Sequence, residues 1–169
     1  SEMLAKAWLP KCKMERIVVH WTAGNARASE GDRGHYHLLI ESDGRVVLGA
    51  KPISANARPI RGSYAAHTRG LNSGSIGVAL CGMVGAVERP FSAGKAPITL
   101  AQWDSLIDLV RELTRAYGIA ITPQTVLSHA EVEKTLGIAQ RGKWDIARLP
   151  WNPKLTSARA VGDTLRVAL

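Results

Sequence analysis

This chain has few cysteines and few aromatic residues, and both shortages argue against whole classes of protein. Its two cysteines, Cys12 and Cys81, have no CxxC spacing. The sequence therefore suggests neither a zinc knuckle nor a redox pair, and we expect two buried, reduced thiols. Aromatic residues make up 5% of the chain, which is few for the platforms on which nucleic-acid bases stack.

Long apolar runs are also lacking. None approaches the roughly 20 residues of a membrane-spanning helix, so we expect no insertion into a membrane. The start of the chain, Ser1 to Lys6, has no apolar segment of a secretory signal, and Ser1-Glu2 ahead of Met3 is typical of a cloning remnant. We therefore expect synthesis in the cytoplasm.

Positive charge, by contrast, is in excess. The 22 Lys and Arg residues against 14 Asp and Glu give a net charge of +8, which favours a polyanionic partner such as nucleic acid, an acidic polymer or an anionic cell envelope. The basic residues are dispersed, without the dense run of a nucleic-acid-binding tail. We expect no nucleic-acid partner, but charge alone leaves a basic nucleic-acid-binding protein or a metal nuclease as an alternative.

Length and composition fit a single globular domain over residues 1–169. A chain of this size buries roughly two thirds of the surface that its unfolded form exposes, so it needs no disulfide or structural metal to fold. Its content of 46% apolar and 21% charged residues is ordinary for a globular protein. No internal repeat or linker divides the chain, and we expect a monomer.

Short apolar runs predict the strands of a sheet. The β-branched run 16–20 ends in a histidine and is followed by a loop. Residues 36–49 form two apolar runs joined at Ser42-Asp43-Gly44, where Asp-Gly favours the positive φ angles of a tight hairpin turn. Residues 75–82 and 125–129 predict two further strands.

Helical patterns fall between and after these strands. Thr99 is placed to N-cap a helix with Gln102 as its capping-box partner, and apolar residues then recur at helical spacing until Gly118. This stripe, with its tryptophan and tyrosine, is expected in the core. A short helix is predicted over 130–134 and a closing helix from Ser157. Stretches punctuated by glycine and proline predict loops: 51–74 and 85–97. Together these elements predict an α/β domain with a central mixed sheet flanked by helices.

Three dispersed residues are candidate metal ligands: His20, His129 and Asp145. Two imidazoles and a carboxylate suit a catalytic zinc, which needs three protein ligands and one position open to water. Both histidines end predicted strands, so only the fold can bring them to Asp145. Lys143 lies two residues before Asp145, and in an extended segment both side chains would point to the same face.

Other ionisable residues have simpler interpretations. We expect Glu30, Asp32 and His35 to lie on a solvated loop ahead of Tyr36. Glu131 and Glu133 follow His129 and are interpreted as acids at the start of a short helix rather than as catalysts.

Five short segments, taken in order, resemble the zinc-dependent N-acetylmuramoyl-L-alanine amidases of the type shared by phage lysozyme-amidases and peptidoglycan recognition proteins. The resemblance covers roughly residues 16–150. Its segments are Ile17-Val18-Val19-His20-Trp21-Thr22-Ala23, Tyr36-His37-Leu38-Leu39-Ile40 with Asp43-Gly44, Ala66-His67 followed by Asn72-Ser73-Gly74-Ser75-Ile76-Gly77-Val78, Leu127-Ser128-His129, and Lys143-Trp144-Asp145.

The resemblance implies a role for each matching residue. It implies Zn²⁺ as cofactor, held by His20, His129 and Asp145 at the edge of the sheet, with Tyr36 and Lys143 as catalytic residues. It further implies a groove for peptidoglycan or a muropeptide, in which the substrate-binding residues are expected to be His67, Asn72 and Trp144.

The chemistry of amide hydrolysis agrees with these roles. Zinc lowers the pKa of its water from 15.7 to about 7, while a cation such as Lys143 stabilises the tetrahedral oxyanion, and Tyr36 can donate a hydrogen bond or orient the water. An endolysin that acts on the wall in the periplasm or after release fits this reading. An enzyme that acts on muropeptides in the cytoplasm fits it equally.

One departure and one alternative accompany the resemblance. After the ligand aspartate many relatives continue Pro-Gly, whereas this chain continues Ile146-Ala147-Arg148, so a different exit of the loop is expected. The alternative is a non-catalytic peptidoglycan-binding module on the same fold. Such relatives typically lack a metal ligand, whereas all three ligand positions here carry competent residues.

Overall fold

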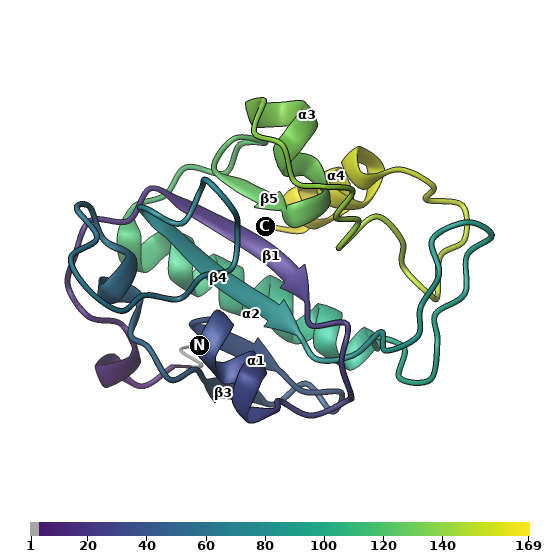
Figure 1. Cartoon of the computed structure of the whole chain (residues 1–169), viewed down its shortest axis with the longest axis horizontal. Coiled ribbons are helices and arrows are strands. Elements are labelled where there is room, and N and C mark those ends of the chain that lie inside the picture. Colours follow the sequence, from purple (N-terminus) through teal and green to yellow (C-terminus); the bar gives the residue numbers. More distant parts are fainter. Residues whose placement is uncertain (1–3) are drawn as a thin grey trace.

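Four parallel strands and one antiparallel edge strand form the centre of the computed structural model, which describes residues 4–169 (Figure 1). The sheet has the order β3-β2-β4-β1-β5, and only β3 runs against its neighbour. The strands are β1 (Arg16–Trp21), β2 (Leu38–Ile40), β3 (Val46–Leu48), β4 (Ser75–Leu80) and β5 (Val126–Ser128). The predicted α/β fold with a mixed sheet is confirmed.

The alternation of side chains along β1 decides where the first histidine points. This strand lies between β4 and β5 and is buried on both faces. Ile17, Val19 and Trp21 pack into the main core, whereas Val18 belongs to a separate cluster on the opposite face. Because neighbouring residues of a strand point to opposite faces, His20 lies on the same face as Val18.

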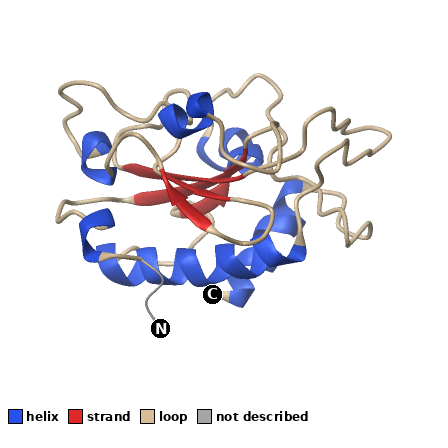
Figure 2. Ribbon diagram, turned by 90° about the horizontal axis from the view of Figure 1, so that it is seen from below, coloured by secondary structure: helices blue, strands red, loops and turns tan. Residues whose placement is uncertain are grey.

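The main core lies between the sheet and two helices. Helix α2 (Leu100–Tyr117) runs along one face of the sheet (Figure 2), and α4 (Ala158–Ala168) joins the same hydrophobic cluster through Val161 and Leu165. The capping box of Thr99 with Gln102 and the left-handed Gly118 confirm the predicted bounds of α2. Both of the longer predicted helices are therefore present.

Short helices and long loops cover the other face of the sheet (Figure 2). They include α1 (Glu30–His35) and α3 (Val132–Leu136), and the 3-10 turns η2 (Ile53–Asn56) and η3 (His129–Glu131). A further 3-10 turn, η1 (Lys6–Trp8), precedes the sheet. No helix of the described part of the chain is both long enough and apolar enough to cross a membrane.

The prediction of a loop ahead of Tyr36 is wrong, because Glu30–His35 form helix α1, although Glu30 and His35 are exposed as expected. Ser29 caps this helix, and its side chain accepts from the Asp32 amide while Asp32 accepts from the Ser29 amide. This reciprocal pair satisfies two amides that a helix start leaves open. Gly31 and Gly34 within six residues weaken any helical signal in the sequence.

The predicted hairpin is present, but its turn differs in detail. Strands β2 and β3 pair antiparallel, and the chain reverses over Ser42-Asp43-Gly44. Only Gly44 of this turn has a positive φ, of 90°, as in a three-residue hairpin loop that ends in a left-handed residue. A side chain there would meet Ser105 of α2, whose hydroxyl donates to the Gly44 carbonyl at 2.7 Å.

Candidate metal centre

The three candidate ligands come together although they are far apart in the sequence. His20 is the penultimate residue of β1, and His129 directly follows β5. Because these strands are parallel neighbours, their carboxyl ends reach the same edge of the sheet. Asp145 arrives from the segment after α3, where its carbonyl accepts the Ala130 amide at 2.6 Å. All three side chains are buried.

The spacing of the donor atoms matches a tetrahedral metal. The Nδ1 atoms of His20 and His129 are 3.1 Å apart. The Oδ2 atom of Asp145 lies 3.3 Å from His20 Nδ1, and its Oδ1 atom lies 3.5 Å from His129 Nδ1. Zinc bonds of about 2.0–2.2 Å in a tetrahedron place ligand atoms about 3.3–3.5 Å apart. The three residues form a group able to bind a metal ion, and their donor chemistry fits Zn²⁺.

Burial sets the protonation states that such a site needs. Burial lowers the pKa of His20, and the neighbouring Asp145 offsets this only in part. Burial by itself raises the pKa of Asp145, but the His129 and His20 side chains outweigh it and lower that pKa overall. At neutral pH His20 is therefore neutral and Asp145 is ionised, which are the forms that bind a metal.

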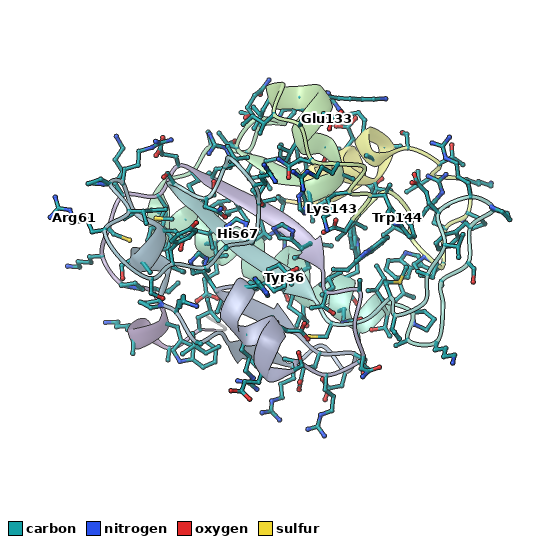
Figure 3. All side chains as sticks on the ribbon, in the orientation of Figure 1. Tyr36, Arg61, His67, Glu133, Lys143 and Trp144 are labelled. Atoms are coloured by element: carbon teal, nitrogen blue, oxygen red, sulfur yellow. The ribbon has the colours of Figure 1, made fainter. Side chains whose placement is uncertain are left out.

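A cavity of about 870 Å³ opens over this centre. His129 and Asp145 line it, and His20 lies fully buried beneath. The other predicted site residues also line it: Tyr36, His67, Asn72, Lys143 and Trp144. Figure 3 shows Tyr36, His67 and Lys143 grouped over β1 and β4, and Arg61 well away from them. The structure thus brings every predicted site residue to one groove.

Tyr36 lies at one side of the groove, directly after α1. Its ring centroid is 5.1 Å from that of His20. Burial raises the pKa of the Tyr36 phenol, and Asp145 and Asp32 raise it further. The hydroxyl is therefore protonated at neutral pH and able to donate a hydrogen bond. His35, predicted to lie on the surface, is exposed and borders the same groove.

Lys143 and Trp144 form another part of the wall. The Lys143 side chain is exposed at the groove, while Asp145 is buried beneath it. Both residues border the cavity as expected, but a turn begins at Asp145, so the segment is not one extended strip. The centroid of the Trp144 ring lies 4.7 Å from that of Trp21 and 6.3 Å from that of Phe91, and both pairs of rings are nearly perpendicular. These contacts fix the indole as an apolar wall.

The loop that carries His67 and Asn72 is held by its own hydrogen bonds and by the side chain of Asn56. Asn72 Oδ1 accepts the backbone amides of His67 and Thr68, each at 3.0 Å. His67 is buried, and burial lowers its pKa well below the ordinary value, with His20 and His37 adding to the effect. His67 is therefore neutral. Its ring nitrogens face His20, Thr68 and the Ser75 carbonyl.

Sequence reasoning missed Gln140, which is buried and contacts a ligand. Its side-chain oxygen lies 2.7 Å from His129 Nε2, its side-chain nitrogen donates to the Arg69 carbonyl at 2.7 Å, and its backbone amide donates to Glu133 at 2.8 Å. No motif or periodicity marks a single glutamine in an irregular segment, so nothing in the sequence alone pointed to it.

The acids after His129 have structural partners. Glu131 accepts the Ser128 amide in a capping box and forms an ion pair with Arg166, while Glu133 holds the Gln140 backbone. Neither acid lines the groove, which agrees with the expectation that they are not catalysts.

Comparison with known proteins gives this arrangement a family. The model of the family described as N-acetylmuramoyl-L-alanine amidase, Amidase_2, matches residues 10–147. The match spans most of the chain, and the chain therefore belongs to this family. No curated protein matches the sequence significantly.

Two solved structures have a similar fold, and a third is less similar. PlyL has a TM-score of 0.51 and 20% identity, covering 80% of this chain and 74% of its own. The amidase AmiD from E. coli, solved with the substrate anhydro-N-acetylmuramic acid-L-Ala-D-gamma-Glu-L-Lys, has a TM-score of 0.50 and 24% identity, covering 75% of this chain and 51% of its own. The endolysin amidase LysCS from Clostridium intestinale has 22% identity and a TM-score of 0.49, covering 83% and 80%.

Proposed function

We propose that this chain is a zinc-dependent enzyme that hydrolyses the amide bond between N-acetylmuramic acid and L-alanine of the peptidoglycan stem peptide. The observation that carries the proposal is the convergence of His20 Nδ1, His129 Nδ1 and the Asp145 carboxylate at tetrahedral spacing beneath a groove. Membership of the amidase family supplies the reaction type.

Each element of the groove has a part in this reaction. Zinc held by His20, His129 and Asp145 would supply Lewis-acid activation of water and of the scissile carbonyl. Lys143 places an exposed cation at the rim, which stabilises the negative charge that develops on the carbonyl oxygen. Tyr36 keeps its proton and donates a hydrogen bond to the same oxygen or orients the attacking water.

The walls of the groove suit a muropeptide. Trp144, braced by Trp21 and Phe91, offers a flat surface for a sugar ring or a peptide. The amidase AmiD, which has a similar fold, was solved with a muropeptide substrate. The net charge of +8 favours approach to an anionic wall, and we propose an endolysin-like role in wall cleavage by a monomer, without a nucleic-acid partner.

The product identifies the bond that is cut. Purified sacculi and soluble muropeptides are incubated with the zinc-loaded protein, and the products are separated and identified by mass spectrometry. We expect stem peptides with a free L-alanine amino group and glycan with intact N-acetylmuramic acid, and the better of the two substrates defines the site of action. Zinc-loaded protein that binds sacculi but releases no stem peptide would overturn the proposal in favour of a binding module.

A further inference from the structure

The hydrogen bonds of Gln140 determine which nitrogen of His129 carries a proton. The Arg69 carbonyl can only accept, so the side-chain nitrogen of Gln140, 2.7 Å away, must face it. The side-chain oxygen of Gln140 then faces His129 Nε2 at 2.7 Å. Because that oxygen can only accept, His129 Nε2 donates, and Nδ1 is the ring nitrogen left to face the candidate metal site.

A second, separate chain of hydrogen bonds gives the same result for His20. His67 Nε2 lies 3.2 Å from the Ser75 carbonyl and must donate to it. Nδ1 is then the His67 nitrogen left to accept, and it lies 3.1 Å from His20 Nε2. His20 Nε2 therefore donates, and its Nδ1 is also left to face the candidate metal site. The Thr68 hydroxyl, 2.7 Å from the same His67 nitrogen, adds a second donor to it.

These assignments turn three acceptors toward one point. Nδ1 of His20, Nδ1 of His129 and the Asp145 carboxylate meet within 3.5 Å of each other, an arrangement suited to a cation. The residues that impose it are buried and firmly held: a side chain at Gly77 would lie 2.5 Å from the His67 ring, so only glycine admits that ring. One segment, residues 67–72, serves both histidines, because it supplies His67 and the Arg69 carbonyl.

We propose that Gln140 and His67 are positioning residues that hold His129 and His20 in the tautomer that presents Nδ1 to the metal. The proposal rests on the metal site of the proposed function but not on the reaction. Partners that orient a ligand histidine contribute about 10–100-fold to metal affinity. Zinc affinity should therefore depend on residues that do not touch the metal.

Zinc affinity of Gln140 variants, measured by competition with a chromophoric chelator, tests this directly. Gln140→Leu removes the acceptor, and we expect zinc to bind about 10–100-fold more weakly. Gln140→Glu keeps an acceptor oxygen for His129 Nε2 but turns a second oxygen toward the Arg69 carbonyl, so we expect it to regain part of the lost affinity and to bind zinc more tightly than Gln140→Leu. Gln124→Leu, the same change at an exposed glutamine outside the groove, should bind zinc like the wild type. Wild-type affinity in Gln140→Leu would overturn the proposal.

A measurement on the unaltered, metal-free protein avoids any defect in folding. Long-range proton–nitrogen NMR spectra of the imidazoles distinguish the two neutral tautomers. We expect protons on Nε2 of His20, His67 and His129, and a proton on Nδ1 of either ligand would contradict the proposal. These experiments distinguish failure of the positioning proposal from failure of the proposed amidase function. If the protein has these tautomers and this zinc dependence but hydrolyses nothing, the amidase function is refuted and the positioning role stands.

Discussion

Arg166 of the C-terminal helix forms a buried two-pronged ion pair with Glu131, two residues beyond the candidate metal ligand His129. Its two guanidinium nitrogens lie 2.7 and 3.1 Å from the two carboxylate oxygens of Glu131. A third contact joins Arg166 to the Val126 carbonyl of β5 at 3.0 Å. Helix α4 is therefore fastened to β5 and to the turn that contains the candidate ligand His129.

Removal of one partner of this pair should be costly. Arg166→Met leaves the Glu131 carboxylate buried without its partner, and we expect a loss of about 3–5 kcal/mol in the free energy of unfolding, measured by urea denaturation. Arg159→Met, in the same helix, breaks an exposed pair with Asp163 and should change stability little. Equal effects of the two changes would contradict the account.

A variant at Lys143 should separate an effect on catalysis from an effect on metal binding. Lys143→Ala removes a cation that lies at the groove but is not a ligand, so we expect normal zinc content and turnover that is lower by about 10²–10³-fold. Elemental analysis and the rate of stem-peptide release check the two parts. Loss of zinc together with activity would show that Lys143 holds the site together rather than acting on the substrate.

Tyr36→Phe tests the phenol in a similar way. The phenyl ring keeps the packing against His20, 5.1 Å away, while the hydroxyl that donates a hydrogen bond is lost. We expect a lower kcat with little change in KM or in thermal stability, because the lost interaction forms in the transition state. An unchanged kcat would remove Tyr36 from the reaction.

His37 should make the fold sensitive to acid. Burial lowers its pKa from the ordinary 6.5 to about 4, against a weaker opposing effect of Asn56. Between these values the unfolded chain binds a proton that the folded chain does not. The free energy of unfolding should therefore fall as the pH drops from about 6.5 to about 4, by about 3 kcal/mol from this group.

A variant without the imidazole isolates this contribution. His37→Gln does not titrate in this range, so its stability should fall less steeply with acid than that of the wild type. Urea denaturation of both proteins between pH 4.5 and 7.5 measures the difference. Parallel curves would show that His37 titrates normally in the folded protein.

The sequence predicted the parts of the fold that carry a clear local pattern. Strand β1 was predictable from its continuous β-branched run, and helix α2 from apolar residues at a spacing of about 3.6 residues. The positions of His20 and His129 at strand ends were also predictable, because each residue ends an apolar run. That the two strands are parallel neighbours, which brings the histidines together, came from the structure. Asp145 lies in an irregular segment, and only the order of motifs shared with the family pointed to it.

The supporting residues could not be predicted in this way. Gln140 and the 67–72 segment lie in loops whose paths are set by tertiary contacts rather than by local spacing. The helix α1 carries two glycines, so its capping box was outweighed by their low helix propensity. The Ser42-Asp43-Gly44 turn was predicted at the right place, but its left-handed residue is Gly44 alone, a choice that depends on packing against Ser105.

Restoration of activity by metal tests the central claim most directly. Protein stripped by a chelator is titrated with Zn²⁺, and stem-peptide release is followed alongside the bound metal. We predict that release is absent at first, rises in proportion to bound zinc and levels off at one ion per chain, whereas His129→Ala and Asp145→Ala neither retain zinc nor regain activity. Full release by the stripped wild type, or by zinc-free His129→Ala, would contradict the account.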